Sequence, residues 1–215
     1  MTSPMADNNP IHAPAARERR VALEKRRRVS EMSQEEMRRE LLTSEVTGLP
    51  NRRAFDEAGR SLAVAMCDVD GLKALNNYGY EVGNCVLRAK ASALREAGLE
   101  AYHDKGDEFL CRDKSVEDLR SKLESARAML RDRRIVVQRS DGSTLKITGA
   151  DFSYGVGKDL DEAELALKSH KGERERAGEL ARGQLRGITV RIDNATILIS
   201  TVGTPFSESI DLDLP

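Results

Sequence analysis

The chain has 215 residues, 39% of them hydrophobic, which is enough for one domain of ordinary size with extensions. Its net charge of -1 gives no overall field that would favour nucleic acid or an acidic partner, so no direct nucleic-acid binding is expected. The three cysteines match no zinc-binding spacing and suit a reducing compartment. The sequence shows neither a membrane-spanning apolar run nor an apolar secretory signal, so we expect a cytoplasmic protein without membrane contact.

The N-terminal part of the chain divides into two segments. Residues 1–15 are rich in Pro, Asn and Ala and are expected to be disordered. Residues 16–42 are highly charged and free of Gly and Pro, which predicts a helix, with a capping box at Ser33 and Glu36. This helix is either a solvated face or a docking and dimerisation helix, and its apolar positions keep no regular heptad.

Strands and helices alternate through the rest of the chain. The expected elements are a buried strand within 61–70, a helix over 84–98, a strand pair at 99–103 and 108–112, a helix over 115–132, two strands within 135–148, a strand at 151–157, a helix over 159–182 with Asp161 and Glu164 as a capping pair, a hairpin over 187–202, and a flexible tail over 203–215. Strand pairs joined by short turns make the sheet at least partly antiparallel. The predicted fold class is therefore α/β of the α+β type, a palm-like plan related to ferredoxin, with a mostly antiparallel central sheet flanked by helices.

Acidic residues stand at the ends of two of these strands. Asp68 and Asp70 end the first strand, and Asp107 and Glu108 lie at the tip of the strand pair. If the pair lies beside the first strand, these carboxylates converge on a hard-oxygen site suited to Mg²⁺ or Mn²⁺. Each signal alone also has a plain structural explanation, as a strand end or a hairpin turn.

Four sequence blocks in a fixed order carry a resemblance to a known family. They read VTGLPNRRAFD at 46–56, DVDGLKALNNYGYEVGN at 68–84, KGDEF at 105–109, and DFSYGVG at 151–157 followed by AELALKSHKGERER at 163–176. With these blocks the chain resembles the GGDEF domain of the diguanylate cyclases, and residues 43–182 are assigned to such a domain.

The resemblance implies an activity and its partners. In this family two GTP molecules condense into cyclic di-GMP with release of pyrophosphate, and the reaction depends on Mg²⁺ or Mn²⁺. Two domains face each other, each holding one GTP, so a homodimer is required for turnover. The resemblance makes Asp68, Asp107 and the backbone carbonyl of Val69 metal ligands. It places Glu108 beside the metals, where it helps the attacking 3′-hydroxyl to lose its proton.

The resemblance also implies nucleotide contacts. Leu72 and Lys73 lie where the chain of the family wraps the triphosphate, and Lys171 would reach the terminal phosphates. Asn76 would contact the guanine edge, and Gly106 would let the hairpin approach the nucleotide closely. The plainer alternatives are that both lysines are ordinary surface residues and that Asn76 caps a helix.

Two departures from the family pattern concern the nucleotide itself. Lys105 replaces the first Gly of the family's GGDEF signature, which reads KGDEF at 105–109. The lysine therefore points to solvent, binds a phosphate or blocks the site. Asn84 replaces the usual aspartate, and its amide can match either guanine or adenine. The plainer alternative for Asn84 is that it caps the following helix.

Two further departures concern phosphates and product. The Arg that follows the closing lysine in the family falls on Glu175, and Arg174 or Arg176 beside it could substitute. Residues 96–99 read EAGL where the product-binding R-x-x-D is expected, so no such feedback site is predicted. Three hypotheses remain: an active cyclase using GTP, a degenerate module that binds nucleotide without turnover, and a cyclase that uses ATP and makes an adenine-containing product.

Overall fold

The computed structural model describes residues 31–139, 143–180, 187–192 and 195–197. The expected disordered segment 1–15 and the expected tail 203–215 lie outside these ranges. In chain order the elements are α2 (Gln34–Leu42), α3 (Arg52–Glu57), β1 (Ala63–Val69), α4 (Leu72–Asn76), α5 (Tyr80–Glu96), β2 (Glu100–Lys105), β3 (Glu108–Asp113), α6 (Val116–Asp132), β4 (Ile135–Gln138), β5 (Thr144–Thr148), β6 (Phe152–Gly157), α7 (Leu160–Arg176), β7 (Thr189–Ile192) and β8 (Ala195–Ile197).

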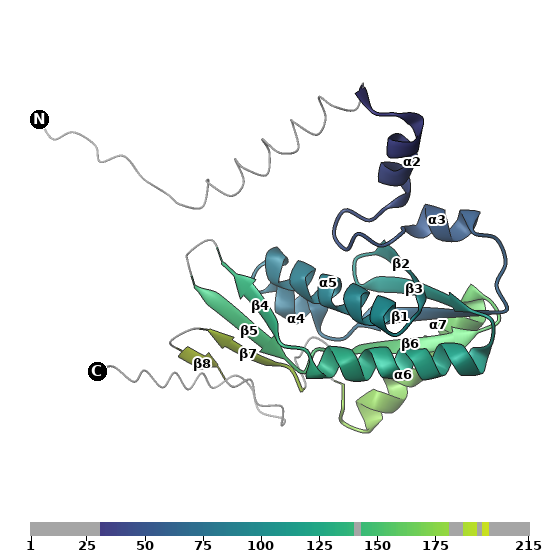
Figure 1. The fold of residues 1–215 in the computed structure, drawn as a ribbon. Coiled ribbons are helices and arrows are strands. Elements are labelled where there is room, and N and C mark those ends of the chain that lie inside the picture. The colour runs from purple at the N-terminus through teal and green to yellow at the C-terminus, as the bar shows by residue number, and fades with distance from the viewer. Residues whose placement is uncertain (1–30, 140–142, 181–186, 193–194, 198–215) are drawn as a thin grey trace, which may run out of the picture.

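The central sheet has the strand order β2-β3-β1-β6, and every neighbouring pair is antiparallel. Helices α5 and α6 cover one face of this sheet, and α7 lies against the other face, packed on β6 and β1 (Figure 1). Along β1, Ala65, Cys67 and Val69 belong to the large apolar cluster under α5 and α6. The alternate residues Val64 and Met66 face α7, because successive side chains of a strand point to opposite faces.

A second antiparallel sheet has the order β4-β5-β7-β8. The hairpin expected over 187–202 supplies β7 and β8, and its turn at 193–194 lies outside the described residues. Because β7 pairs with β5, with Val190 opposite Ile147, the hairpin completes this sheet and is not a free extension. Both of these residues are fully buried.

Helix α2 begins where the sequence predicts a cap. Ser33 accepts a hydrogen bond from the backbone N–H of Glu36, and the Glu36 carboxylate accepts one from the backbone N–H of Ser33. This reciprocal pair satisfies two N–H groups that the helix leaves open. The helix therefore starts at Gln34, and residues 16–30 of the expected charged helix lie outside the described part of the chain.

Helix α7 begins earlier than its predicted cap. Asp161 and Glu164 were expected to cap it, but the N-cap is Asp159, whose side chain accepts from the backbone N–H of Glu162. Asp159 has an extended backbone, with φ -143°, whereas Asp161 already lies in the first helical turn. The helix ends at Arg176, short of the predicted end at residue 182.

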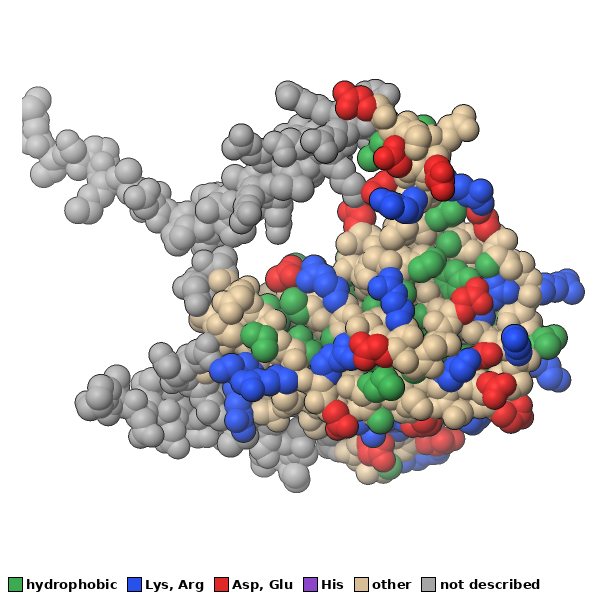
Figure 2. Space-filling view, viewed as in Figure 1, with side chains coloured by type: hydrophobic (Ala, Val, Ile, Leu, Met, Phe, Trp, Pro, Cys, Tyr) green, Lys and Arg blue, Asp and Glu red, His purple; other side chains and the backbone are tan. Residues whose placement is uncertain are grey.

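The surface carries charge of both signs. On the face shown in Figure 2, basic and acidic side chains are interspersed over most of the visible area. Within the described ranges, no helix is both long enough and apolar enough to cross a membrane.

Candidate functional site

The acidic residues at the ends of β1 and β3 meet at one end of the central sheet. This region, formed by Asp68, Val69, Asp107 and Glu108, is called the acidic edge below. Because β1 pairs with β3, Asp68 lies directly opposite Glu108. The backbone N–H of Val69 donates to the carbonyl of Asp107 at 3.3 Å, which holds the hairpin tip against the end of β1. The structure thus brings together the four residues that the resemblance assigns to the metal, although their role stays a prediction.

Two lysines contact this acidic edge. Lys171 of α7 places its Nζ 2.7 Å from Oδ1 of Asp68, and both side chains are partly exposed. Lys105, the last residue of β2, places its Nζ 3.6 Å from Oε2 of Glu108. Lys105 is 75% exposed, so its side chain lies over the edge from the solvent side and does not fill the interior.

The signature turn consists of Gly106 and Asp107. It connects Lys105 of β2 to Glu108 of β3, which is its partner in the strand pairing. Gly106 has φ +53°, in the left-handed region that other residues seldom adopt. A Cβ on Gly106 would meet nothing within 4 Å. Within this chain the backbone angle, and not crowding, therefore requires glycine in the turn.

Four of the predicted nucleotide contacts, Leu72, Lys73, Asn76 and Asn84, lie on α4 and α5, the two helices that follow β1. Leu72 is buried and Lys73 exposed in the first turn of α4, where the N-cap is a glycine and no side chain caps the helix. Asn76 ends α4 and lies against α5, since a Cβ on Gly83 would come within 2.0 Å of its Oδ1. Asn84 is the next residue of α5.

Asn84 lies inside α5, whose N-cap is Gly79, so the interpretation of Asn84 as a helix cap is wrong. Within the described residues, no hydrogen bond or ion pair joins Asn76 or Asn84 to the acidic edge.

The acidic edge fits a divalent cation of the hard-oxygen type. Its donors are the carboxylates of Asp68 and Asp107 and a backbone carbonyl, the ligands that Mg²⁺ and Mn²⁺ accept. In the part of the chain that the structure describes, no group of three or more His, Cys, Asp or Glu side chains is placed so that it could hold a metal ion, so the carboxylates alone do not form a complete metal site. Mg²⁺ commonly uses one or two carboxylates and completes its coordination with water and substrate phosphates, so this donor set is adequate for a nucleotide-bound metal.

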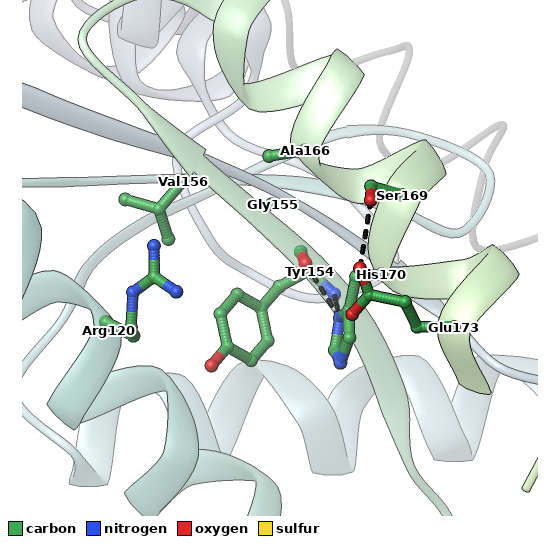
Figure 3. A pocket seen from close by; sticks show the side chains of 8 residues that line it. All are labelled: Arg120, Tyr154, Gly155, Val156, Ala166, Ser169, His170 and Glu173. Carbon is green, nitrogen blue, oxygen red and sulfur yellow. Dashed lines mark hydrogen bonds between the residues drawn. The ribbon is translucent and has the colours of Figure 1, made fainter. Parts of the chain in front are cut away.

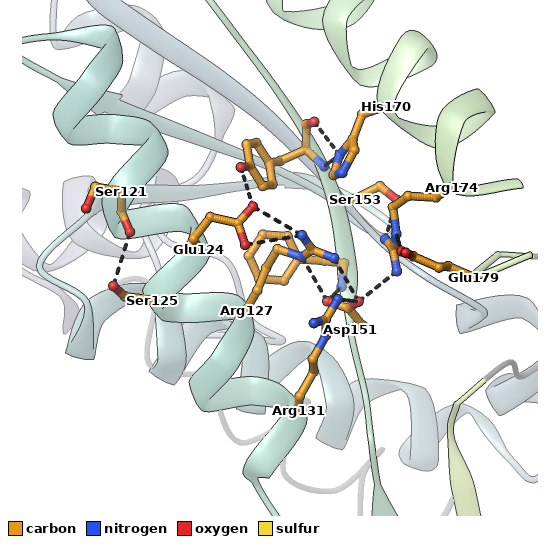
Figure 4. Close-up of polar contacts among 12 residues, drawn as sticks. Ser121, Glu124, Ser125, Arg127, Arg131, Asp151, Ser153, His170, Arg174 and Glu179 are labelled. Atoms are coloured by element: carbon orange, nitrogen blue, oxygen red, sulfur yellow. Dashed lines mark hydrogen bonds and ion pairs between the residues drawn. The ribbon is translucent and has the colours of Figure 1, made fainter. Parts of the chain in front are cut away.

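A buried ionic network links arginines of α6 and α7 to Asp151 and Ser153, as Figure 4 shows. Arg174 of α7 donates to Asp70 at 2.5 Å, to Ser153 at 2.9 Å and to Asp151 at 2.7 Å. Arg127 of α6 donates through Nε and Nη2 to the two oxygens of Asp151, both at 3.1 Å. The network therefore ties α6 and α7 to the ends of β1 and β6.

This network corrects one sequence-based interpretation. Arg174 is a candidate to replace the missing phosphate-binding arginine at Glu175, but its side chain is only 8% exposed and pairs with three carboxylates, those of Asp70, Asp151 and Glu179. It is a structural residue here, and Arg176 is the exposed alternative. The sequence carried a signal that was missed: a carboxylate two residues beyond Asp68, at the end of a buried strand, needs a partner.

Ionisation in the network is set by its ion pairs. Burial alone would raise the pKa of Asp151, but the hydrogen bonds from Arg127 and Arg131 outweigh burial and lower it. Burial raises the pKa of the Tyr154 phenol, and its hydrogen bond to Glu124 raises it further. The network is therefore charged on both sides at neutral pH.

Lys90 is a second residue that sequence reasoning missed. It is fully buried, and its Nζ is a buried side-chain polar atom without a hydrogen-bond partner, alone of its kind among the described residues. The Nζ lies 4.2 Å from the ring centroid of Phe109 and 4.8 Å from that of Phe152. Burial lowers the pKa of Lys90. Its position on the apolar stripe of α5, four residues after Val86, was the available signal.

One cavity lies away from this edge, between α6 and α7 beside β6 (Figure 3). It measures about 290 Å³ and is lined by Arg120, Tyr154, Gly155, Val156, Ala166, Ser169, His170 and Glu173. Nδ1 of His170 contacts the backbone N–H and the carbonyl of Tyr154, at 3.2 and 2.8 Å. The cavity contains none of the predicted site residues.

Comparison with solved structures finds GGDEF domains. The diguanylate cyclase SiaD from Pseudomonas aeruginosa, solved in complex with its activator SiaC, is 26% identical, with a TM-score of 0.51 over 75% of this chain and 72% of that chain. The coiled coil and GGDEF domain of DgcB from Caulobacter crescentus, in complex with c-di-GMP, is 21% identical, with a TM-score of 0.50 over 79% of this chain and 96% of that chain. The GGDEF domain of FimX from Pseudomonas aeruginosa is 18% identical, with a TM-score of 0.50 over 64% of this chain and 95% of that chain. Models of protein families and curated proteins gave no match.

These likenesses confirm the predicted fold class, a mixed helix and antiparallel-sheet architecture. The described domain has the fold of the GGDEF domains, and the diguanylate cyclase SiaD is similar to it at 26% identity.

Proposed function

We propose that this protein is a metal-dependent nucleotidyltransferase of the diguanylate cyclase type, which condenses two GTP molecules into cyclic di-GMP and releases pyrophosphate. The observation that carries the proposal is the register of β1 and β3, which sets Asp68 opposite Glu108 with Asp107 in the adjoining turn. Likeness to the diguanylate cyclase SiaD at 26% identity supports it.

The acidic edge supplies the chemistry in this proposal. Mg²⁺ or Mn²⁺ would be held by Asp68, Asp107 and the carbonyl of Val69, and when bound it supplies positive charge that stabilises phosphoryl transfer. Glu108 would accept the proton of the attacking 3′-hydroxyl. Lys171 would leave Asp68 for the terminal phosphates of the nucleotide, an exchange that is easy for a partly exposed pair.

Turnover in this proposal needs two copies of the chain. Each domain holds one GTP, and the 3′-hydroxyl of each nucleotide must reach the α-phosphate of the other. The proposed active form is therefore a homodimer in which two acidic edges face each other. Neither edge alone can close the cyclic product.

Base recognition rests on the asparagine pair. Asn84 could accept from guanine N1–H and donate to O6, or accept from the adenine 6-amino group and donate to N1. Gly83, the neighbour of Asn84 in α5, leaves room for the side chain of Asn76, since a Cβ there would come within 2.0 Å of Asn76 Oδ1. GTP is the proposed substrate, and ATP is the alternative that Asn84 allows.

A second function, nucleotide binding without turnover, is favoured by one contact. Lys105 lies 3.6 Å from the carboxylate of Glu108. A lysine paired with this carboxylate competes with the 3′-hydroxyl for it and would have to move away before Glu108 could accept the proton. In that case the domain would serve as a regulatory or interaction module.

A product assay read out by mass spectrometry distinguishes the cyclase from the binding module. The full-length protein is incubated with Mg²⁺ or Mn²⁺ and with GTP, ATP or both. Asp107→Ala removes a proposed metal ligand, and Asp56→Ala is the matched control, because it removes an exposed aspartate of α3 that pairs with Arg52.

Cyclic di-GMP made by the wild type and by Asp56→Ala, but not by Asp107→Ala, is the expected result. An adenine-containing product would assign altered base choice to Asn84. Absence of any product, together with tight GTP binding, would replace the cyclase with the binding module. The Lys105→Gly variant then tests whether the Lys105–Glu108 contact is the block.

A further inference from the structure

His103 of β2 lies beneath the signature turn. It is directly opposite Phe109 in the β2–β3 pairing, and the two rings stack with centroids 4.7 Å apart. The register of the two strands shifts between His103 and Lys105. Such an irregularity bends the strand and turns a side chain away from its usual direction, often next to an active site.

Both ring nitrogens of His103 are engaged. Nε2 lies 3.1 Å from the carbonyl oxygen of Gly106, and Nδ1 lies 2.6 Å from Oγ of Ser44. A carbonyl can only accept, so Nε2 must carry the hydrogen. Burial lowers the pKa of His103, which keeps the ring neutral near pH 7, so Nδ1 accepts and the Ser44 hydroxyl donates.

Ser44 is itself fixed in the loop between α2 and α3. Its backbone N–H donates to the carbonyl of Leu49 at 2.8 Å, and its Oγ accepts from the backbone N–H of Thr47 at 3.4 Å. The backbone N–H of His103 donates to the carbonyl of Pro50 at 2.8 Å. The loop therefore holds His103 by both its main chain and its side chain.

The same loop is tied to the last turn of α2, which stands apart from the sheet in Figure 1. The backbone N–H of Asn51 donates to the carbonyl of Leu42, and its side-chain amide donates to the carbonyl of Leu41, both at 2.8 Å. A chain of hydrogen bonds therefore runs from α2 through Asn51 and the loop to His103 and the carbonyl of Gly106.

We propose that His103 is a positioning residue for Asp107, because its hydrogen bond fixes the carbonyl of Gly106. His103 thereby couples the loop between α2 and α3 to the acidic edge. The turn is then held from two sides, by His103 at Gly106 and by the N–H of Val69 at the carbonyl of Asp107. The metal-binding part of this inference rests on the proposed function. The holding of the turn does not.

Two variants separate the bond to Gly106 from the rest of the histidine. His103→Gln and His103→Asn both remove the imidazole and its stacking on Phe109. Glutamine places its amide nitrogen near the position of Nε2 and keeps a donor for the Gly106 carbonyl, whereas asparagine is too short. Tyr102→Phe is the control, since the neighbouring Tyr102 faces the other side of the sheet and its hydroxyl contacts Glu100 and Arg112, away from the turn.

Two measurements are made on the full-length variants: hydrogen exchange of residues 105–109, and Mn²⁺ affinity by electron paramagnetic resonance with α,β-methylene-GTP present. In His103→Asn we expect faster exchange and Mn²⁺ binding about three- to tenfold weaker than in His103→Gln, the effect of one lost hydrogen bond. Tyr102→Phe should match the wild type in both.

The inference is overturned if the Asn and Gln variants exchange and bind Mn²⁺ alike, since stacking on Phe109 would then be the whole contribution of His103. If the wild type binds no Mn²⁺, the proposed metal-dependent function fails. The exchange rates alone then decide whether His103 holds the turn, which keeps the two failures distinct.

Discussion

Two ion pairs join the same strand end to the same helix, and they differ chiefly in exposure. Asp68 pairs with Lys171 in a contact whose side chains are 18% and 32% exposed. Asp70 pairs with Arg174 in a contact where both side chains are 8% exposed. A partly exposed pair is screened and can exchange its partner for a metal or a phosphate, whereas breaking a buried pair leaves an uncompensated charge. Asp68 and Asp70 are only two residues apart, yet the first forms a partly exposed ion pair and the second a buried one.

The largest expected effect comes from breaking the inner pair. Arg174→Met leaves the buried carboxylate of Asp70 with only Ser153 and takes one of the three arginines from Asp151. The free energy of unfolding should fall by about 3–5 kcal/mol, as for other buried pairs that lose one partner. Urea unfolding measures it. A loss below about 1 kcal/mol would show that the inner pair behaves like an exposed one.

Lys90→Met should change stability in the opposite direction. The Lys90 ammonium group lies over the rings of Phe109 and Phe152 but donates to no hydrogen-bond acceptor. Replacing Lys90 by an apolar side chain of similar size should therefore stabilise the fold by about 1–3 kcal/mol.

The same variant should alter the pH dependence. Burial lowers the pKa of Lys90 in the folded state from 10.5. At pH values between the lowered pKa and 10.5, Lys90 is therefore protonated in the unfolded chain but neutral in the folded one. The wild type should therefore gain stability as pH rises from the lowered value towards 10.5, and the variant should lack this gain. Melting temperatures at neutral pH and near pH 10 test both points, and equal slopes would contradict them.

Acid should weaken the inner network through Asp151. Its carboxyl pKa is lowered in the folded state from 3.8, so its contribution is complete above that pH and is lost as the pH falls through the lower, folded value. Wild-type melting temperatures should therefore drop more steeply below pH 3.8 than those of Asp151→Asn. Parallel curves would mean that other carboxyl groups control acid unfolding.

The smallest effect on stability is expected at the outer pair. Lys171→Met should lower the free energy of unfolding by less than about 1 kcal/mol, because the pair is partly exposed. Under the proposed function it should nevertheless weaken GTP binding, which isothermal titration with the full-length protein measures. Unchanged GTP affinity would remove Lys171 from the nucleotide site and leave the stability comparison intact.

Much of the fold was predictable because its signals are local. The helix at 115–132 and the strand pair around the signature turn are present close to their predicted bounds, since apolar periodicity and turn residues act over a few positions. The helix predicted over 84–98 is present as α5, but it begins four residues earlier, at Tyr80. The cap of α7 was misplaced by two residues because both Asp159 and Asp161 are followed three positions later by a glutamate, and only the backbone conformation distinguishes them.

The candidate site was predictable in its residues but not in its contacts. The sequence alone placed Asp68, Asp107 and Glu108 at strand ends, because strand patterns are local properties. It explained Gly106 by close approach to a nucleotide, whereas the structure shows a left-handed backbone angle that favours glycine. Only the tertiary structure decided which cation each carboxylate meets. Arg174 turns inward while Lys171 reaches the edge, because the rotation of α7 on β1 and β6, and not the residue types, sets the two partners.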